Sequence, residues 1–269
     1  MTPKHLALIA IAEQTMSAVE AGRYVNAAHR SVDIAPLVAE AVAGTVLHEL
    51  GEPLRAPSGG HATAIAVTTA STLEALIRLD GRAGGPLACL NFASAKRPGG
   101  GFLGGAQAQE ESLARSSALY ACLQRQPSHY ERNRNHPSPH YLDLAIFSPR
   151  VPFFRDDAGG WLERPTLASV ITCAAPNASA LRGDGELDPA PVAATLHRRA
   201  AFVLAVAAHH GVERLVLGAW GAGVFGNDPA VVAEAFAAAL DALPGAFAEV
   251  VFAIPGAGRA NHDAFAARF

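Results

Sequence analysis

Cysteine is scarce in this chain. Only Cys89, Cys122 and Cys173 occur among 269 residues, and they are far apart in the sequence. An odd number of well-separated cysteines fits neither a disulfide framework nor a zinc site. The sequence therefore predicts buried, reduced thiols, as in a cytoplasmic protein, and no bound metal.

Long apolar runs and an excess of positive charge are also missing. No stretch approaches the roughly 20 apolar residues of a membrane span. The N-terminal apolar run is interrupted by Glu13 and is interpreted as part of an amphipathic helix. The formal net charge is −3, which excludes a broad basic surface for many nucleic-acid phosphates. We therefore expect neither membrane insertion nor direct DNA binding.

Hydrophobic residues make up 50% of the chain, enough to bury a large core in one domain with an extension. After residue 60, strand and helix patterns alternate, which is typical of α/β proteins. We expect a monomer with a helical N-terminal extension over residues 1–60 and an α/β domain over residues 61–269. The expected strands cover residues 61–67, 86–92, 141–147, 151–154, 167–175, 214–217 and 249–254. The expected helices cover residues 3–22, 32–50, 71–79, 109–126, 191–210 and 230–243, with a short one at the C-terminus.

A glycine-rich loop precedes one of these helices. Three consecutive glycines, Gly99, Gly100 and Gly101, follow an apolar strand, and two more glycines come shortly after. Glycine reaches positive φ cheaply and lets backbone amides approach a ligand closely. Loop amides and helix N-termini favour anions. No Ser, Thr, Asp or Asn stands between Gly101 and Glu110 to cap the helix with its own side chain. The sequence therefore predicts a phosphate-binding loop.

The first turn of that helix contains Gln109, Glu110 and Glu111. Acidic residues there can simply complement the helix dipole, but next to a phosphate loop they indicate acid/base chemistry on a phosphorylated ligand. Neighbouring helix residues diverge by about 100°, unlike opposed glycosidase carboxylates, which lie about 5 to 9.5 Å apart. One glutamate is expected to align a sugar hydroxyl, while the other protonates the leaving oxygen and then activates water. Burial, the second carboxylate and a bound diphosphate are expected to raise the pKa of the acid.

A second glycine loop, GAWGAGVFGNDP, covers residues 218–229 between a strand and a helix. It matches G-x-G-x-x-G, but only one strand follows and no acidic residue ends that strand, so a dinucleotide-binding fingerprint is rejected. No GKS or GKT follows a glycine cluster, which argues against a P-loop nucleotide hydrolase. We expect both loops to hold one diphosphate at the carboxyl edge of the sheet. The predicted contacts in this loop are Gly221, Ala222, Gly223, Val224, Phe225 and Gly226.

The segment GGGFLGGAQAQEE, residues 99–111, resembles the glycine and Gln-Glu-Glu pattern of the bacterial-type poly(ADP-ribose) glycohydrolases. The resemblance runs from about residue 20 to the C-terminus and implies a macrodomain-like three-layer α/β/α sandwich with a mixed sheet that binds ADP-ribose. It implies Glu111 as general acid/base and Glu110 as the positioning residue. It also implies that Phe225 stacks on adenine, with core packing as the alternative. Animal members have an asparagine before the glycines, where this chain has Ser94. The contacts expected from this region are Ser94, Gly99, Gly100, Gly101 and Gln109.

The resemblance implies hydrolysis of the ribose–ribose O-glycosidic bond of poly(ADP-ribose), releasing ADP-ribose without a cofactor. Two alternatives stay open: a module that binds ADP-ribose without cleaving it, and a hydrolase that acts on mono-ADP-ribosyl proteins or on a free ADP-ribose derivative. Residues 124–140 are polar and proline-broken, and are predicted to form a surface loop. Arg125, Arg132 and Arg134 in this segment are interpreted either as contacts to a polyanionic substrate or as solvated surface charges.

Overall fold

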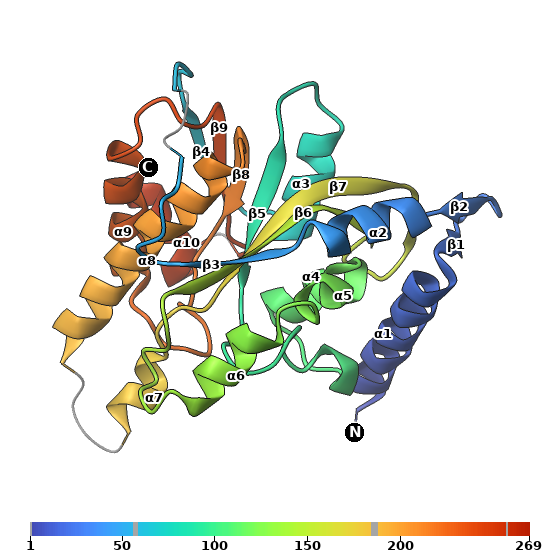
Figure 1. Ribbon diagram of the computed structural model, residues 1–269, viewed down its shortest axis with the longest axis horizontal. Helices are drawn as coiled ribbons and strands as arrows, with labels where there is room; N and C mark the ends of the chain where they lie inside the picture. The colour runs from blue at the N-terminus through green and yellow to red at the C-terminus, as the bar shows by residue number, and fades with distance from the viewer. Residues whose placement is uncertain (1, 56–58, 184–187, 257) are drawn as a thin grey trace.

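The computed structural model describes residues 2–55, 59–183, 188–256 and 258–269. At its centre is a seven-stranded mixed sheet with the order β3-β6-β7-β5-β8-β9-β4, and helices cover both faces (Figure 1). The strands are β1 (Arg23–Val25), β2 (Ser31–Asp33), β3 (Val46–Glu49), β4 (Ala64–Thr68), β5 (Leu87–Phe92), β6 (Leu144–Arg155), β7 (Trp161–Cys173), β8 (Arg214–Leu217) and β9 (Glu249–Ala253). The helices are α1 (Pro3–Ala21), α2 (Ala35–Ala43), α3 (Thr72–Asp80), α4 (Gln109–Ser116), α5 (Leu119–Leu123), α6 (Pro127–Asn135), α7 (Ala178–Arg182), α8 (Pro189–His209), α9 (Pro229–Asp241) and α10 (Ala260–Arg268), with a 3-10 turn η1 (Phe102–Gly104).

Five strands of the sheet, β7, β5, β8, β9 and β4, run parallel to one another. β6 runs antiparallel to its two neighbours, β3 and β7. Because parallel strands end at the same edge of a sheet, the loops that follow β5, β8 and β9 meet there. These are the loops in which the sequence concentrates its glycines and glutamates.

Side-chain alternation along the strands divides the core into two halves. On β8, Leu215 and Leu217 pack into the core formed with α8, α9 and α10, while Val216 faces the core formed with α3, α4 and α5. Successive strand residues point to opposite faces, so a strand buried on both faces reads as a continuous apolar run. Figure 1 shows α8, α9 and α10 gathered on one side of the sheet. The three-layer α/β/α architecture with a mixed sheet is confirmed.

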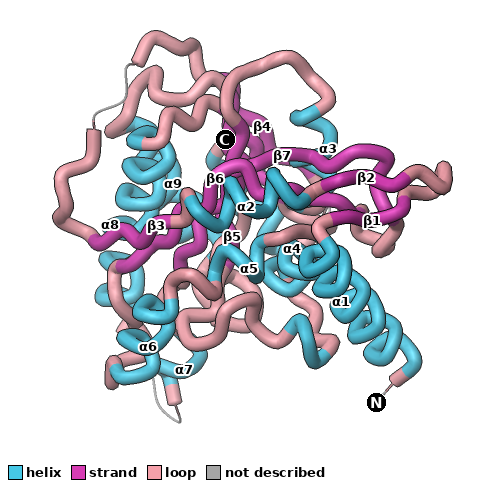
Figure 2. The backbone as a smooth tube through the Cα atoms, turned by 45° about the vertical axis from the view of Figure 1, so that its right-hand side comes forward, coloured by secondary structure: helices cyan, strands magenta, loops and turns pink. Residues whose placement is uncertain are grey.

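The N-terminal 60 residues are not purely helical. The expected helix over residues 32–50 is wrong: α2 ends at Ala43, and β3 pairs antiparallel with β6 inside the central sheet. Gly44 follows the helix, and the β-branched residues Thr45 and Val46 favour an extended strand. Figure 2 shows α1 lying beside α4, with which it makes contacts. Residues of the N-terminal segment therefore pack into the same core as the rest of the chain, and the division into an extension and a domain at residue 60 stays a prediction.

Residues 124–140, expected to be a loop, contain helix α6. Pro127 occupies the start of the helix, where its missing N–H group would have no intrahelical partner. Arg132 donates hydrogen bonds of 3.0 and 2.6 Å to the two carboxylate oxygens of Glu49 on β3. This polar helix has little apolar periodicity for a sequence pattern to detect. Its attachment depends on contacts far away in the chain, because Tyr130 packs into the core and Arg132 pairs with Glu49.

Three further boundaries differ from the expectation. The helix that begins at Gln109 stops at Ser116, because Ser117 forms a bridge with Phe153 of β6 and α5 starts a new helix. The two strands expected over residues 141–154 are one strand, β6, whose register shifts after Ser148. Residues 177–191, which fall between an expected strand and an expected helix, contain α7 and the start of α8, while residues 184–187 lie outside the described part of the chain. No helix in the described ranges is long and apolar enough to cross a membrane.

Candidate active site

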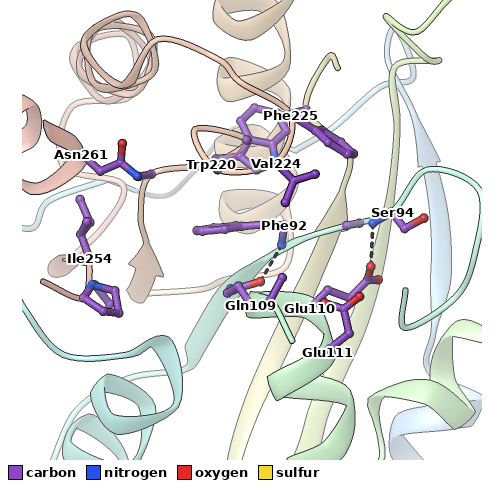
Figure 3. A pocket seen from close by; sticks show the side chains of 18 residues that line it. Phe92, Ser94, Gln109, Glu110, Glu111, Trp220, Val224, Phe225, Ile254 and Asn261 are labelled. Atoms are coloured by element: carbon purple, nitrogen blue, oxygen red, sulfur yellow. Dashed lines mark hydrogen bonds between the residues drawn. The ribbon is translucent and has the colours of Figure 1, made fainter. Parts of the chain in front are cut away.

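A cavity of about 400 Å³ lies where β5, β8 and β9 end. Figure 3 shows Gln109, Glu110 and Glu111 on one wall, at the start of α4, with the glycine loop after β8 across from them. Small-molecule sites usually occupy about 300 to 1,000 Å³ and often lie at the carboxyl ends of parallel strands. The size and position of the cavity therefore suit a nucleotide-sized ligand.

The Glu110 side chain is hydrogen-bonded to residues at and just after the end of β5, the strand that precedes the glycines. This side chain is 3% exposed. The Ser94 backbone N–H donates to its Oε2 at 2.7 Å, and Asn91 Nδ2 donates to its Oε1 at 3.2 Å. Asn91 also donates to Thr172 Oγ1 on the neighbouring strand at 3.1 Å. The Glu110 carboxyl group is thus fixed to β5 and β7, which leaves it little freedom to turn.

Burial raises the pKa of Glu110 to about 8, with a smaller contribution from the adjacent Glu111 carboxylate, while the donors Ser94, Asn91 and Gly99 oppose the shift. Between pH 4.5 and 8 the folded chain therefore keeps a proton on Glu110 that the unfolded chain releases. The folded state binds more protons in this window, so the Glu110 contribution to stability falls as the pH rises. This loss of folding free energy reaches at most about 5 kcal/mol above pH 8 and is absent below pH 4.5.

We expect Glu110→Gln to remove this pH dependence. The difference in melting temperature between Glu110→Gln and the wild type should move in favour of the variant as the pH rises from 5 to 8, and should then level off. Thermal unfolding followed by circular dichroism at a series of pH values measures it. Because all other titrating groups are shared, they cancel in the difference. A difference that stays flat over this range would show that Glu110 titrates alike in the folded and unfolded chains.

Glu111 is held by the first glycine loop. The Gly101 N–H donates to Glu111 Oε1 at 2.9 Å. A Cβ atom on Gly100 would lie 2.2 Å from the same oxygen, and Gly100 has a φ of +60°. Glycine is therefore required at position 100 both for the backbone conformation and for the place of the carboxylate.

The amides of this loop differ from the expected phosphate-binding loop. The Ser94 and Gly101 amides donate to Glu110 and Glu111, and the Gly100 amide donates to the Arg97 carbonyl oxygen. The amides of this loop do bind acidic groups, but these groups belong to the protein itself: they are the side-chain carboxyl groups of Glu110 and Glu111. Direct contacts of these glycines with a substrate stay a prediction.

Gln109 fixes the start of α4 to the end of β5. Its Oε1 accepts from the Phe92 N–H at 2.8 Å, and its Nε2 donates to the Leu90 carbonyl oxygen at 2.8 Å. Nε2 also lies 3.2 Å from Thr72 Oγ1 on α3. The α4 N-cap, Ala108, makes no side-chain capping bond, in agreement with the sequence. The side-chain amide of Gln109 thus extends the β5 hydrogen-bonding pattern and sets the direction in which the two glutamates project.

The second glycine loop, in contrast, leaves three consecutive backbone amides unpaired among the described residues. Asn227, which is 3% exposed, donates through Nδ2 to the carbonyl oxygens of Pro176 and Gly221 at 2.9 and 3.1 Å and closes the base of the loop. Gly221 has a φ of +71°, and a Cβ atom there would lie 2.3 Å from Asn227 Nδ2. Within the part of the chain that the structure describes, the N–H groups of Gly223, Val224 and Phe225 donate to no protein acceptor. Three consecutive unpaired amides beside a cavity are suited to an anionic group.

The structure brings most of the predicted site residues to one cavity and leaves some outside its lining. Phe225 lies at the glutamate end, close to Ser94 in Figure 3, whereas Ile254 and Asn261 lie at the opposite end. The predicted residues that line the cavity are Ser94, Gln109, Glu110, Glu111, Gly221, Gly223, Val224 and Phe225. Those outside the lining are Gly99, Gly100, Gly101, Ala222 and Gly226.

Sequence reasoning missed three residues of the site. Asn91 is fully buried behind Glu110, and its signal was a polar residue near the end of an otherwise apolar strand. Phe92 and Ile254 line the cavity, but as apolar residues at strand ends they look like ordinary core residues. Only their position at the carboxyl ends of β5 and β9 could have indicated contact with a ligand.

A glutamate pair at the strand ends of a mixed α/β/α sandwich, facing a glycine loop with free amides, defines a macrodomain-like glycosidase. Residues 12–156 match the family model described as microbial-type PARG, catalytic domain, where PARG is poly(ADP-ribose) glycohydrolase. This chain therefore belongs to the microbial-type PARG family. Among curated proteins, none matches the chain.

Solved structures of bacterial PARGs are similar over most of the chain. The PARG of Thermomonospora curvata has 49% sequence identity and a TM-score of 0.90, with 98% of this chain and 99% of that chain covered. The same enzyme bound to the inhibitor ADP-HPD has 47% identity and a TM-score of 0.88, with the same coverage. The PARG of Deinococcus radiodurans in complex with ADP-ribose has 43% identity and a TM-score of 0.77, with 88% of this chain and 98% of that chain covered.

Proposed function

We propose that this protein hydrolyses the ribose–ribose O-glycosidic bond of poly(ADP-ribose) and releases ADP-ribose. The observation that carries the proposal is that Glu111 lines the same cavity as the free amides of the second glycine loop. An acid/base group and an anion-binding loop on one cavity are what a phosphorylated sugar substrate requires. The relatives solved with ADP-ribose and with ADP-HPD support this substrate class.

The arrangement of the cavity favours one orientation of ADP-ribose. The terminal ribose lies at Glu111 and Ser94, and the diphosphate lies against the amides of residues 223–225. Adenine then reaches the end of the cavity lined by Phe92, Ile254 and Asn261. Phe225 lies at the glutamate end, 6.1 Å from the Tyr141 ring. This position favours contact of Phe225 with the terminal ribose over the expected stacking on adenine.

In the proposed mechanism Glu111 protonates the leaving oxygen as the bond to the anomeric carbon breaks. The positive charge that develops on the ribose is sheltered by the neighbouring diphosphate, which the free amides hold in place. Water then attacks the anomeric carbon, with Glu111 acting as base. Glu110, fixed by Ser94 and Asn91, positions a ribose hydroxyl. None of these steps calls for a cofactor.

We further propose that the protein works as a cytoplasmic monomer and does not bind DNA directly. All three cysteines are buried and free, which is compatible with a reducing compartment. The net charge of −3 gives no general attraction to nucleic acid. Light scattering at several protein concentrations would reveal any oligomer, and a DNA mobility-shift assay would reveal DNA binding.

Product analysis tests the proposed reaction. The wild-type protein is incubated with radiolabelled poly(ADP-ribose) and, separately, with a mono-ADP-ribosylated protein, and the products are separated by chromatography. We expect ADP-ribose to be released from the polymer. Release from the mono-ADP-ribosylated protein with the polymer untouched would instead identify a mono-ADP-ribosyl hydrolase. An intact polymer together with normal ADP-ribose binding by calorimetry would identify a binding module.

A further inference from the structure

A group of cations lies beside the glutamate end of the cavity. Lys96 and Arg97 are exposed and follow the cavity-lining Ser94 directly. Arg134 of α6 donates to the Lys96 carbonyl oxygen at 2.9 Å and so joins this group. We call Lys96, Arg97 and Arg134 the basic rim. In residues 2–55, 59–183, 188–256 and 258–269 none of the three forms an ion pair with a carboxylate, whereas the nearby Arg132 is paired with Glu49.

Tyr141 connects the basic rim to the second glycine loop. The Lys96 ammonium lies 6.0 Å from the centre of the Tyr141 ring, and the same ring lies 6.1 Å from the Phe225 ring. A cation at this distance from an aromatic face is attracted to it. The Lys96 ammonium and the loop that offers free amides therefore both lie beside the ring of Tyr141.

The backbone that presents Tyr141 is unusual and is held firmly. Tyr141 has a φ of +60°, which is uncommon for a bulky residue. The fully buried Arg199 donates to the carbonyl oxygens of His140 and Tyr141 at 2.6 and 2.9 Å, and it pairs with Asp143 at 2.7 Å. Strained conformations persist where the surroundings enforce them, and they gather at functional sites.

The chemistry of the polymer brings a second diphosphate close to this position. If one unit fills the cavity as proposed above, its anomeric carbon is at Glu111 and the leaving oxygen departs from the glutamate end. That oxygen belongs to the adenosine ribose of the next ADP-ribose unit, and the same ribose carries a diphosphate. Lys96 is two residues from Ser94, a span of at most about 7 Å of extended chain. Its ammonium can therefore reach a phosphate near the leaving ribose.

We propose that the basic rim binds the diphosphate of the ADP-ribose unit that carries the leaving oxygen. This second nucleotide subsite lies outside the cavity. The proposal rests on the proposed function, because that function sets the orientation of ADP-ribose in the cavity. Lys96 and Arg97 pair with the phosphate oxygens, Arg134 fixes the loop, and Tyr141 keeps the Lys96 side chain beside the cavity. The subsite makes the protein prefer two linked units over a single ADP-ribose.

Equilibrium binding tests the subsite without relying on catalysis. In a Glu111→Gln background, the affinities of a two-unit ADP-ribose oligomer and of ADP-ribose are measured by calorimetry. We expect the oligomer to bind on the order of tenfold more tightly. The double variant Lys96→Glu/Arg97→Glu should abolish this preference and leave the affinity for ADP-ribose unchanged. Arg78→Glu is the control for a charge reversal outside the rim. Arg78 is an exposed cation in the last turn of α3, whereas Thr72 at the start of that helix contacts the cavity-lining Gln109. The proposal would be overturned if the Glu111→Gln protein with Lys96 and Arg97 intact bound the two-unit oligomer and ADP-ribose with equal affinity.

Kinetics with two leaving groups provides the second test. For the rim double variant, kcat/KM for the polymer should fall about tenfold and depend less on salt. The value for 4-nitrophenyl ADP-ribose, whose leaving group has no phosphate, should stay within about twofold of the wild type. Equal losses on both substrates would place the defect inside the cavity and overturn the subsite. If the wild type cleaves neither substrate, the proposed reaction fails, while an oligomer preference that depends on Lys96 still supports the subsite.

Discussion

Glu111→Gln is expected to lower kcat for release of ADP-ribose from poly(ADP-ribose) on the order of 10³-fold. Glutamine keeps the shape of the side chain and can still accept the Gly101 N–H, but it can neither donate the proton to the leaving oxygen nor take one from water. General acid/base groups contribute about 10² to 10⁴-fold to enzymatic rates. Labelled polymer and single-turnover conditions isolate the chemical step, and calorimetry gives the affinity for ADP-ribose, which should change little.

A matched control for Glu111→Gln is Glu131→Gln. Glu131 is an exposed glutamate on α6 outside the cavity lining, so the same chemical change there should leave kcat within about twofold of the wild type. The result that counts against Glu111 as the acid/base group is retention of more than about a tenth of the wild-type kcat by Glu111→Gln. A loss of ADP-ribose binding in parallel with kcat would also count against it, because it would indicate a role in binding.

Gly100→Ala is expected to lower kcat about 10²-fold and to destabilise the fold by about 1 kcal/mol. The added Cβ would lie 2.2 Å from Glu111 Oε1 and 3.2 Å from Glu110 Oε2, so the carboxylates must move. The φ of +60° at position 100 adds a conformational cost that alanine bears and glycine does not. Turnover of labelled polymer and thermal unfolding measure the two effects separately.

Gly104→Ala is the control in the same loop. A Cβ on Gly104 would meet no atom within 4 Å, so this variant should keep wild-type turnover and stability within about 0.5 kcal/mol. If Gly100→Ala loses stability but keeps its kcat, the glycine serves only the backbone, and the interpretation that it makes room for the Glu111 carboxylate is wrong.

The sequence predicted helices and strands correctly where the residues of the element itself carry a clear helix or strand pattern. The helix expected over residues 71–79 is present as α3, and Ser71 and Glu74 at its start each accept the other's backbone N–H. β8 occupies the expected residues because its short apolar run is buried on both faces. β3 was missed because a strand of four residues directly after an alanine-rich helix is too short to show a strand pattern, and its pairing with β6 involves residues about 100 positions away in the chain.

The sequence by itself determined the family of this protein and predicted Glu110 and Glu111 as its acidic site residues. Two glycine loops and a Gln-Glu-Glu turn at strand ends are local patterns, and local patterns can be recognised in the sequence without knowledge of the fold. Only the tertiary structure decided what each amide binds. The first loop folds onto Glu110 and Glu111 and uses its N–H groups there, while Asn227 closes the second loop and leaves three amides free. A hydrogen bond is made with the acceptor that is nearest in space, and the fold determines that distance.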